Sequence, residues 1–237
     1  MRSTNWLLAL LSTSAVAAAA CGGSGAGRMS VAAKTPAATV AATGGALDLG
    51  GGIALARVRL AVASVKLEGG AEAGPGATDG DGSGGGHDDG PSHAATVDVH
   101  GEVAVGPFAV DLSGDGLAGG VRRVFDTAVP AGAYRELAIE IAPAGASLAA
   151  MGGRSVIVDG TIDAAPFTFS SSLRAVQRVE GAFTVAADGA SSRVTRTVDP
   201  HGWFAGPDRR LDPTSDADRA AIEASVAASI HASRDDD

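Results

Sequence analysis

Hydrophobic and polar residues alternate with a period of two along most of the chain after Leu47. This period places alternate side chains on opposite faces of a β-strand, so it predicts strands with one buried face. Between residues 53 and 67 the alternation changes phase twice, which predicts bulges or short bends in one long run. The apolar positions of that run are Ile53 and Leu55, then Val58, Leu60 and Val62, then Val65 and Leu67.

Shorter alternating runs follow, separated by turn residues. Pro107 interrupts one of them, as expected of a residue that cannot donate to a sheet and is tolerated at an edge or a strand start. Asp188-Gly189 lies between two runs and favours the tight turn of a hairpin. About eight short strands predict an all-β domain over residues 46–214, an immunoglobulin-like antiparallel β-sandwich. The runs cover about 97–105, 108–112, 137–141, 156–158, 167–169, 177–186 and 193–198.

The end of the chain has a different period. Apolar residues recur every fourth position from Ile222 to Ile230, which predicts a helix whose narrow apolar stripe packs on the sandwich. Ser215, with Asp218 three residues later, resembles a capping box at the start of this helix. Residues 215–237 are therefore expected to form a short C-terminal helix and an acidic tail.

Trp203 and Phe204 stand out because aromatic residues make up only 4% of the chain. They could form a platform for a ligand, or they could plug the end of the sandwich. Pro200 and Gly202 bend the chain where a sandwich end must close, so we expect the plug.

The first residues have the features of an export signal. Arg2 is followed by an apolar run that is too short to span a bilayer, and then by the small residues 17–20. Residues 1–20 are therefore predicted to be a signal peptide. The stretch Ala18-Ala19-Ala20-Cys21 resembles the lipobox of bacterial lipoproteins, and this resemblance implies that Cys21 is lipidated and becomes the mature N-terminus.

Cys21 is the only cysteine of the chain, and an unpaired thiol has no structural use in an oxidising compartment. The glycine- and alanine-rich residues that follow predict a flexible tether, so residues 21–45 are expected to be the lipidated cysteine and its tether. The lipobox resemblance also implies the outer membrane, because Gly22 is not the aspartate that commonly retains such proteins in the inner membrane. Cleavage after Ala18 or Ala20 by an ordinary signal peptidase would instead release a secreted protein.

The net charge restricts the partners. The formal charge of the chain is −9, and removing residues 1–20 takes away one arginine and no acid, which gives about −10. Nucleic acids are poor partners for such a chain, because binding phosphates requires a positive face. The expected membrane attachment is the N-terminal lipid alone, and an envelope protein or polysaccharide is the expected kind of partner.

Three stretches resemble a family of uncharacterised bacterial envelope lipoproteins with a β-sandwich domain of unknown function. They are VGPFAVDLSGDGL (residues 105–117), VPAGAYRELAIEI (residues 129–141) with its P-A-G-x-Y turn, and TVDPHGWF (residues 197–204). The resemblance covers about residues 46–232 and implies a β-sandwich with no established catalytic residues. Independently of it, Pro130 and Gly132 favour a turn, and Tyr134 is expected to cap the core with its hydroxyl at the edge.

Motifs for enzymatic chemistry are weak. GDGLAG, residues 114–119, matches a dinucleotide-binding pattern, but Pro130 arrives before a crossover helix could form. No G-x-S-x-G elbow occurs. Glu136 and Glu140 have the spacing of the solvent face of one strand. We therefore expect a non-enzymatic protein without a bound cofactor.

The acidic, glycine-rich loop predicted at residues 69–94 offers the main alternative, a weak divalent-metal-binding function. DGDGSG copies the first half of a calcium loop, but position twelve is Gly90 where a bidentate glutamate is needed. Ordering ten such residues would cost roughly 10–20 kcal/mol, so a tight site from this loop alone is not expected. The candidate ligands within residues 79–93 are Asp79, Asp81, His87, Asp88, Asp89 and His93.

Calorimetric titration separates these functions. We expect negligible heats when residues 22–237 are titrated with Zn²⁺, Cu²⁺ or Ca²⁺, and the same result when residues 79–93 are replaced by a short Gly/Ser turn. Micromolar binding that disappears in the replaced chain would contradict the expectation and favour the metal-binding function.

Overall fold

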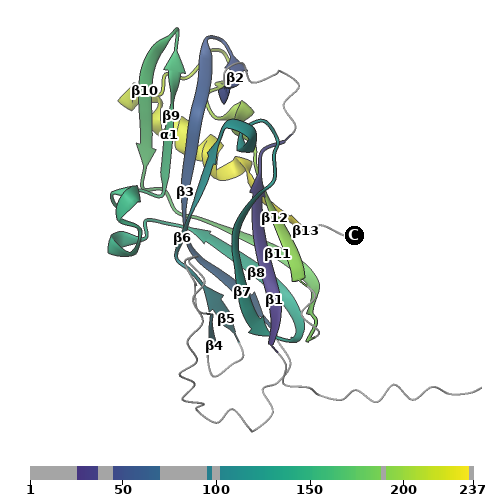
Figure 1. The fold of residues 1–237 in the computed structure, drawn as a ribbon. Coiled ribbons are helices and arrows are strands. Elements are labelled where there is room, and N and C mark those ends of the chain that lie inside the picture. The colour runs from purple at the N-terminus through teal and green to yellow at the C-terminus, as the bar shows by residue number, and fades with distance from the viewer. Residues whose placement is uncertain (1–25, 37–44, 70–94, 98–101, 188–190, 235–237) are drawn as a thin grey trace, which may run out of the picture.

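The computed structural model describes residues 26–36, 45–69, 95–97, 102–187 and 191–234 (Figure 1). Two β-sheets pack around a shared hydrophobic core, which confirms the predicted all-β sandwich. The larger sheet has nine strands. They are β2 (Leu47–Gly50), β3 (Ile53–Glu68), β4 (Thr96–Val97), β5 (Val103–Val105), β6 (Phe108–Ser113), β8 (Gly132–Ile141), β9 (Val156–Ile162), β10 (Ala165–Ser171) and β11 (Ala175–Val185).

The smaller sheet has four strands in the order β13-β12-β1-β7. They are β1 (Ala26–Lys34), β7 (Arg122–Pro130), β12 (Ser191–Val198) and β13 (Ile230–Arg234). One α-helix, α1 (Asp216–Ser229), and the 3-10 turns η2 (Gly114–Gly116), η3 (Gly145–Met151) and η4 (Pro200–Gly202) complete the described elements.

Strand β3 is the central strand of the larger sheet. Along one of its edges it pairs with β8 and then with β9, and along the other it pairs with β5, β6 and β2. Its register shifts at Ala56 against β9 and at Ala63 against β8. These bulges confirm the two predicted phase changes, because each extra residue returns the next apolar side chains to the core.

Strand β1 corrects the prediction that residues 21–45 form a flexible tether. It lies between β12, to which it is parallel, and β7, to which it is antiparallel. Met29, Val31 and Ala33 are buried on one face. At Gly27 an added Cβ would lie 2.4 Å from the carbonyl oxygen of Ala186, so this glycine permits β1 to lie close to the chain at the end of β11.

The predicted hairpin at Asp188-Gly189 is also corrected. The dipeptide itself lies outside the described residues, but the strands on either side of it belong to different sheets. The backbone of β11 pairs with β8, whereas that of β12 pairs with β1 and β13. The chain therefore passes from the larger sheet to the smaller sheet between β11 and β12, where the Asp-Gly dipeptide predicted that these two strands pair with each other.

Tyr134 occupies the position expected for it. Its side chain is buried, and its hydroxyl donates to the carbonyl of Pro130 at 2.7 Å. Burial raises the pKa of the Tyr134 phenol. This bond closes the turn between β7 and β8, so one residue fixes both the turn and the core beneath it.

The C-terminal helix is confirmed, with two differences at its ends. Ile222 and Val226 are buried, as the stripe predicts. Ser215 makes no side-chain capping bond, and the Asp218 carboxylate accepts from Arg209 and from the Asp212 amide instead of completing a capping box. After Ser229 the chain continues as β13, which adds an edge strand to the smaller sheet.

A truncation tests the role of β1. A chain that begins at residue 36 should fail to fold cooperatively, whereas one that begins at residue 26 should melt like the chain that begins at residue 22. Burial of Met29 and Val31 alone is worth about 3–6 kcal/mol, a large part of a typical total stability of roughly 5–15 kcal/mol. Circular dichroism melting measures the difference, and equal melting of all three chains would restore the tether prediction.

Candidate functional site

The candidate site residues predicted from the sequence lie outside the described residues, so the structure neither assembles nor separates them. They are Cys21, Asp79, Asp81, His87, Asp88, Asp89 and His93. Over the ranges that the structure does describe, no three His, Cys, Asp or Glu side chains gather in a way that could hold a metal ion. In the same ranges no helix is long and apolar enough to cross a membrane.

The stretch GDGLAG has a structural role. Its glycines form η2 and the turn after it, and the chain then enters strand β7. The hydroxyl of Thr35 donates to the carbonyl of Leu117 at 2.9 Å and accepts from the Gly119 amide at 3.0 Å. These bonds join the chain after β1 to the turn that precedes β7. The element that follows η2 is strand β7 and not the α-helix that a dinucleotide-binding motif requires.

Trp203 and Phe204 form the predicted plug. Both are buried, and Phe204 meets the rings of Phe167 and Phe169 edge-on, with centroid distances of 5.8 and 6.4 Å. The indole nitrogen of Trp203 donates to the Ser229 hydroxyl at the end of α1. These rings hold residues 200–214, which we call the closing loop, against the larger sheet.

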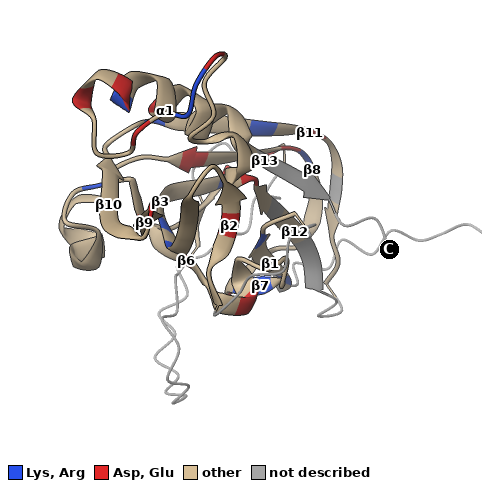
Figure 2. Cartoon of the chain, turned by 90° about the horizontal axis from the view of Figure 1, so that it is seen from above, with Lys and Arg blue, Asp and Glu red and all other residues tan. Residues whose placement is uncertain are grey.

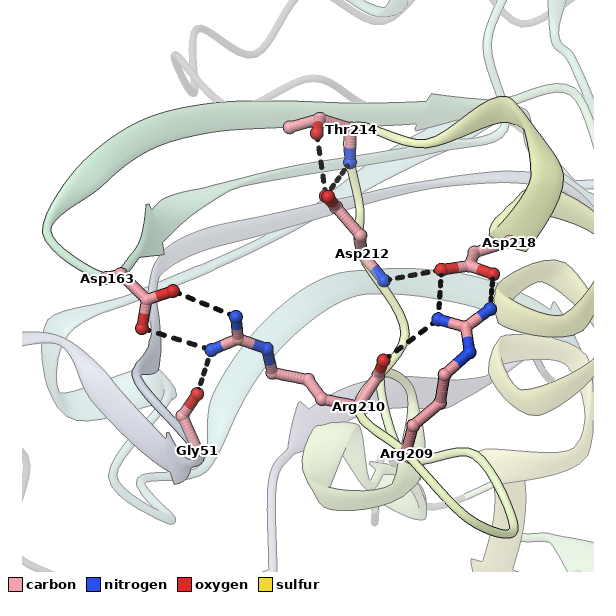
Figure 3. Close-up of polar contacts among 7 residues, drawn as sticks. All are labelled: Gly51, Asp163, Arg209, Arg210, Asp212, Thr214 and Asp218. Atoms are coloured by element: carbon pink, nitrogen blue, oxygen red, sulfur yellow. Dashed lines mark hydrogen bonds and ion pairs between the residues drawn. The ribbon is translucent and has the colours of Figure 1, made fainter.

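Two arginines of the closing loop form a connected cluster of hydrogen bonds and ion pairs (Figure 3). Arg209 makes a two-pronged pair with Asp218 on α1, with Nη1 2.8 Å from Oδ2. The Asp212 amide donates to the same Oδ2 at 2.8 Å. The Asp218 side chain is only 4% exposed, and the hydrogen bond from Arg209 lowers its pKa to about 2.

Arg210 connects three turns. Its guanidinium pairs with Asp163 in the β9–β10 turn, with Nη2 2.8 Å from Oδ2, and it also donates to the Gly51 carbonyl in the β2–β3 turn. Asp163 has a positive φ of 50°, which is unusual for a residue with a side chain. Gly52 has a φ of 81°, and a Cβ there would lie 2.2 Å from Asp163 Oδ1, so this contact requires glycine.

A hollow of about 270 Å³ lies beside this cluster. Its apolar walls include Ile53 and Phe204, and His201, Arg209 and Arg210 are among its polar residues. Both guanidiniums already face carboxylates, so this hollow carries little unpaired charge. Figure 2 shows the same mixture of acidic and basic residues along α1 and the loop before it.

A second hollow, of about 430 Å³, lies on the flank between the end of β10, α1 and Arg154. We call it the flank hollow. The Ser171 hydroxyl donates to Glu223 Oε1 at 2.6 Å and accepts from the Leu173 amide at 3.0 Å. The flank hollow has no histidine in its lining. In the hollow beside the closing loop, His201 Nδ1 lies 2.8 Å from Asp199, but no serine is part of the lining. Neither hollow of the described residues therefore combines a serine, a histidine and an acid as a catalytic triad does.

The sequence did not predict these clusters. The two arginines are adjacent in the chain, but their carboxylate partners lie nine and 47 residues away. The sequence offered only a weak indication of the clusters, namely two adjacent arginines after a bend in a chain rich in aspartate. Comparison with protein-family models, curated proteins and solved structures gave no match, so the resemblance to envelope lipoproteins stays a prediction from the quoted motifs.

Acid titration tests the Arg209–Asp218 pair. The pKa of Asp218 is lowered in the folded chain, so its contribution to stability is present above about pH 3.9, the ordinary pKa of an aspartate, and is lost as the pH falls toward 2. Asp218→Asn should lower Tm by several degrees at pH 7 and flatten the loss of stability between pH 4 and 2.

The matched control is Asp216→Asn, in the same helical turn, because the Asp216 side chain is 98% exposed. It should reproduce the wild-type dependence on pH in the same melting experiment. Wild-type and Asp218→Asn curves that run parallel from pH 7 to 2 would contradict the assigned role.

Proposed function

We propose that this chain is a non-enzymatic, lipid-anchored protein of the bacterial cell envelope, whose sandwich acts as a structural or interaction module. The observation that carries the proposal is the place of Cys21. This lone cysteine directly follows a segment with the features of an export signal, and it precedes β1, the first strand that the structure describes, by five residues.

The short spacing between Cys21 and β1 would orient the domain. Five residues reach at most about 18 Å even when fully extended, so a lipid on Cys21 would keep the start of β1 near the bilayer. Ala26 pairs with Pro130 at the end of β7, and Glu68 at the end of β3 pairs with Glu136 near the start of β8. These strand ends lie together at the lower end of the molecule in Figure 1.

The opposite end would then face away from the membrane. It carries the β2–β3 turn, the β9–β10 turn and the closing loop, which Arg210 and Asp163 tie together. A surface held by such pairs keeps one shape, which suits the recognition of a partner. A net charge of −9 favours an envelope protein or a polysaccharide over nucleic acid.

The proposed lack of enzymatic activity is supported by the hydrogen bonds and ion pairs that the polar side chains make within the protein. The carboxylates of Asp163 and Asp218 and the hydroxyl of Ser171 each hold a structural hydrogen bond. A catalytic group must be positioned toward a substrate and have a pKa matched to its task. The lowered pKa of Asp218 instead reflects an ion pair that fixes the closing loop to α1.

Metabolic labelling tests the anchor. Cells that express the full chain should incorporate an alkyne-tagged fatty acid into the protein, and the protein should pellet with membranes; Cys21→Ser should abolish both. Gly22→Asp is the matched variant, because it retains the cysteine and should retain the label while moving the protein to the inner membrane. A wild-type protein that is unlabelled and soluble would overturn the anchor and indicate secretion.

A further inference from the structure

The flank hollow differs from the hollow beside the closing loop in the state of its charges. Arg154 Nη1 donates to the Ser172 hydroxyl at 3.3 Å, and no ion-pair partner is found for Arg154 among the described residues. Arg209 and Arg210 both have such partners. A guanidinium has five N–H donors, so Arg154 retains most of its capacity to bind an acceptor.

Arg219 provides the second cation of the flank hollow. Its Nη1 donates to the Ser170 carbonyl at 2.7 Å, and its guanidinium lies 5.5 Å from the centre of the Phe169 ring. Its ion pair with Asp216 is long, at 3.6 Å, and the Asp216 side chain is 98% exposed. An exposed pair of this kind is weak, so Arg219 is held in place without being neutralised.

Glu223 gives the hollow an acceptor. The Ser171 hydroxyl binds one of its carboxylate oxygens at 2.6 Å, which fixes the group and leaves the second oxygen to accept a further donor. The lining residues carry two guanidiniums and one carboxylate, and Asp216, 3.6 Å from Arg219, offsets part of the positive charge. Because salt screens charges beyond roughly 8 Å, the Arg154 guanidinium can attract an anion although the whole chain is negative.

We propose that the flank hollow binds an acidic sugar, whose carboxylate lies on Arg154 and Arg219 and whose ring hydroxyls donate to Glu223. A volume of about 430 Å³ is within the range of roughly 300–1,000 Å³ typical of sites for organic ligands and exceeds the need of one inorganic anion. Six of its seven lining residues are polar or charged, with Leu173 the exception, so the ligand is hydrophilic. The inference rests on the proposed function, since it names the ligand class of that interaction module.

Titration calorimetry on residues 22–237 tests the inference, with a galacturonic acid trimer as the probe. The trimer should bind, and the neutral galactose trimer should not. Arg154→Gln should weaken binding of the acidic trimer about tenfold or more, because a charge-assisted hydrogen bond is lost. Arg122→Gln is the matched control, an exposed arginine on β7 in the other sheet, and it should leave binding unchanged.

Glu223→Gln distinguishes a sugar site from a site for a bare anion. A sugar that donates hydroxyls to Glu223 should bind more weakly to this variant, whereas sulfate should bind more tightly once the negative charge is removed. The proposal is overturned if the acidic trimer shows no binding at millimolar concentration, if sulfate binds as well as the trimer, or if Arg122→Gln and Arg154→Gln weaken binding equally. The tested chain lacks Cys21, so these results and those of the labelling experiment are independent.

Discussion

The backbone pairing of β3 is the constraint on which the rest of the structure depends. A single strand of 16 residues is paired along both edges. Its partners are β9 and β2 at its first residues and β8 and β5 at its last residues, with β6 pairing in between. Two bulges keep its apolar side chains in the core across this change of partners. Both ends of the domain, and the turns that each end carries, are therefore positioned by the backbone pairing of this one strand.

The polar clusters are placed by this frame. The β2–β3 and β9–β10 turns meet because both β2 and β9 pair with the first residues of β3. Arg210 then joins the two turns from the closing loop, and Arg209 joins that loop to α1. The flank hollow lies where β10 ends beside α1. Its arginines form fewer and weaker ion pairs with carboxylates than Arg209 and Arg210 do. The two regions thus have different capacities to bind a ligand although they share a helix.

The features that the sequence predicted well depend on large side chains and on patterns within a few consecutive residues. The two phase changes in β3, the Tyr134 cap, the aromatic plug and the stripe of α1 each involve residues whose size or spacing reveals their burial. Strand β1 was missed because alanine and glycine are as common in linkers as in closely packed strands. The arginine clusters were missed because pairs such as Arg210 and Asp163 form only after distant strands have met, so local sequence holds no trace of them.

The position of β1 has a mechanical consequence. Seven of its residues are in register with β12 and eight with β7, and the chain enters this strand directly from its N-terminal side. A pull on the preceding chain along the strand axis would load these hydrogen bonds in shear, so that many of them bear the force together. Peeling would break them one after another at much lower force. The same strand that completes the sheet is thus built to transmit tension into the body of the domain.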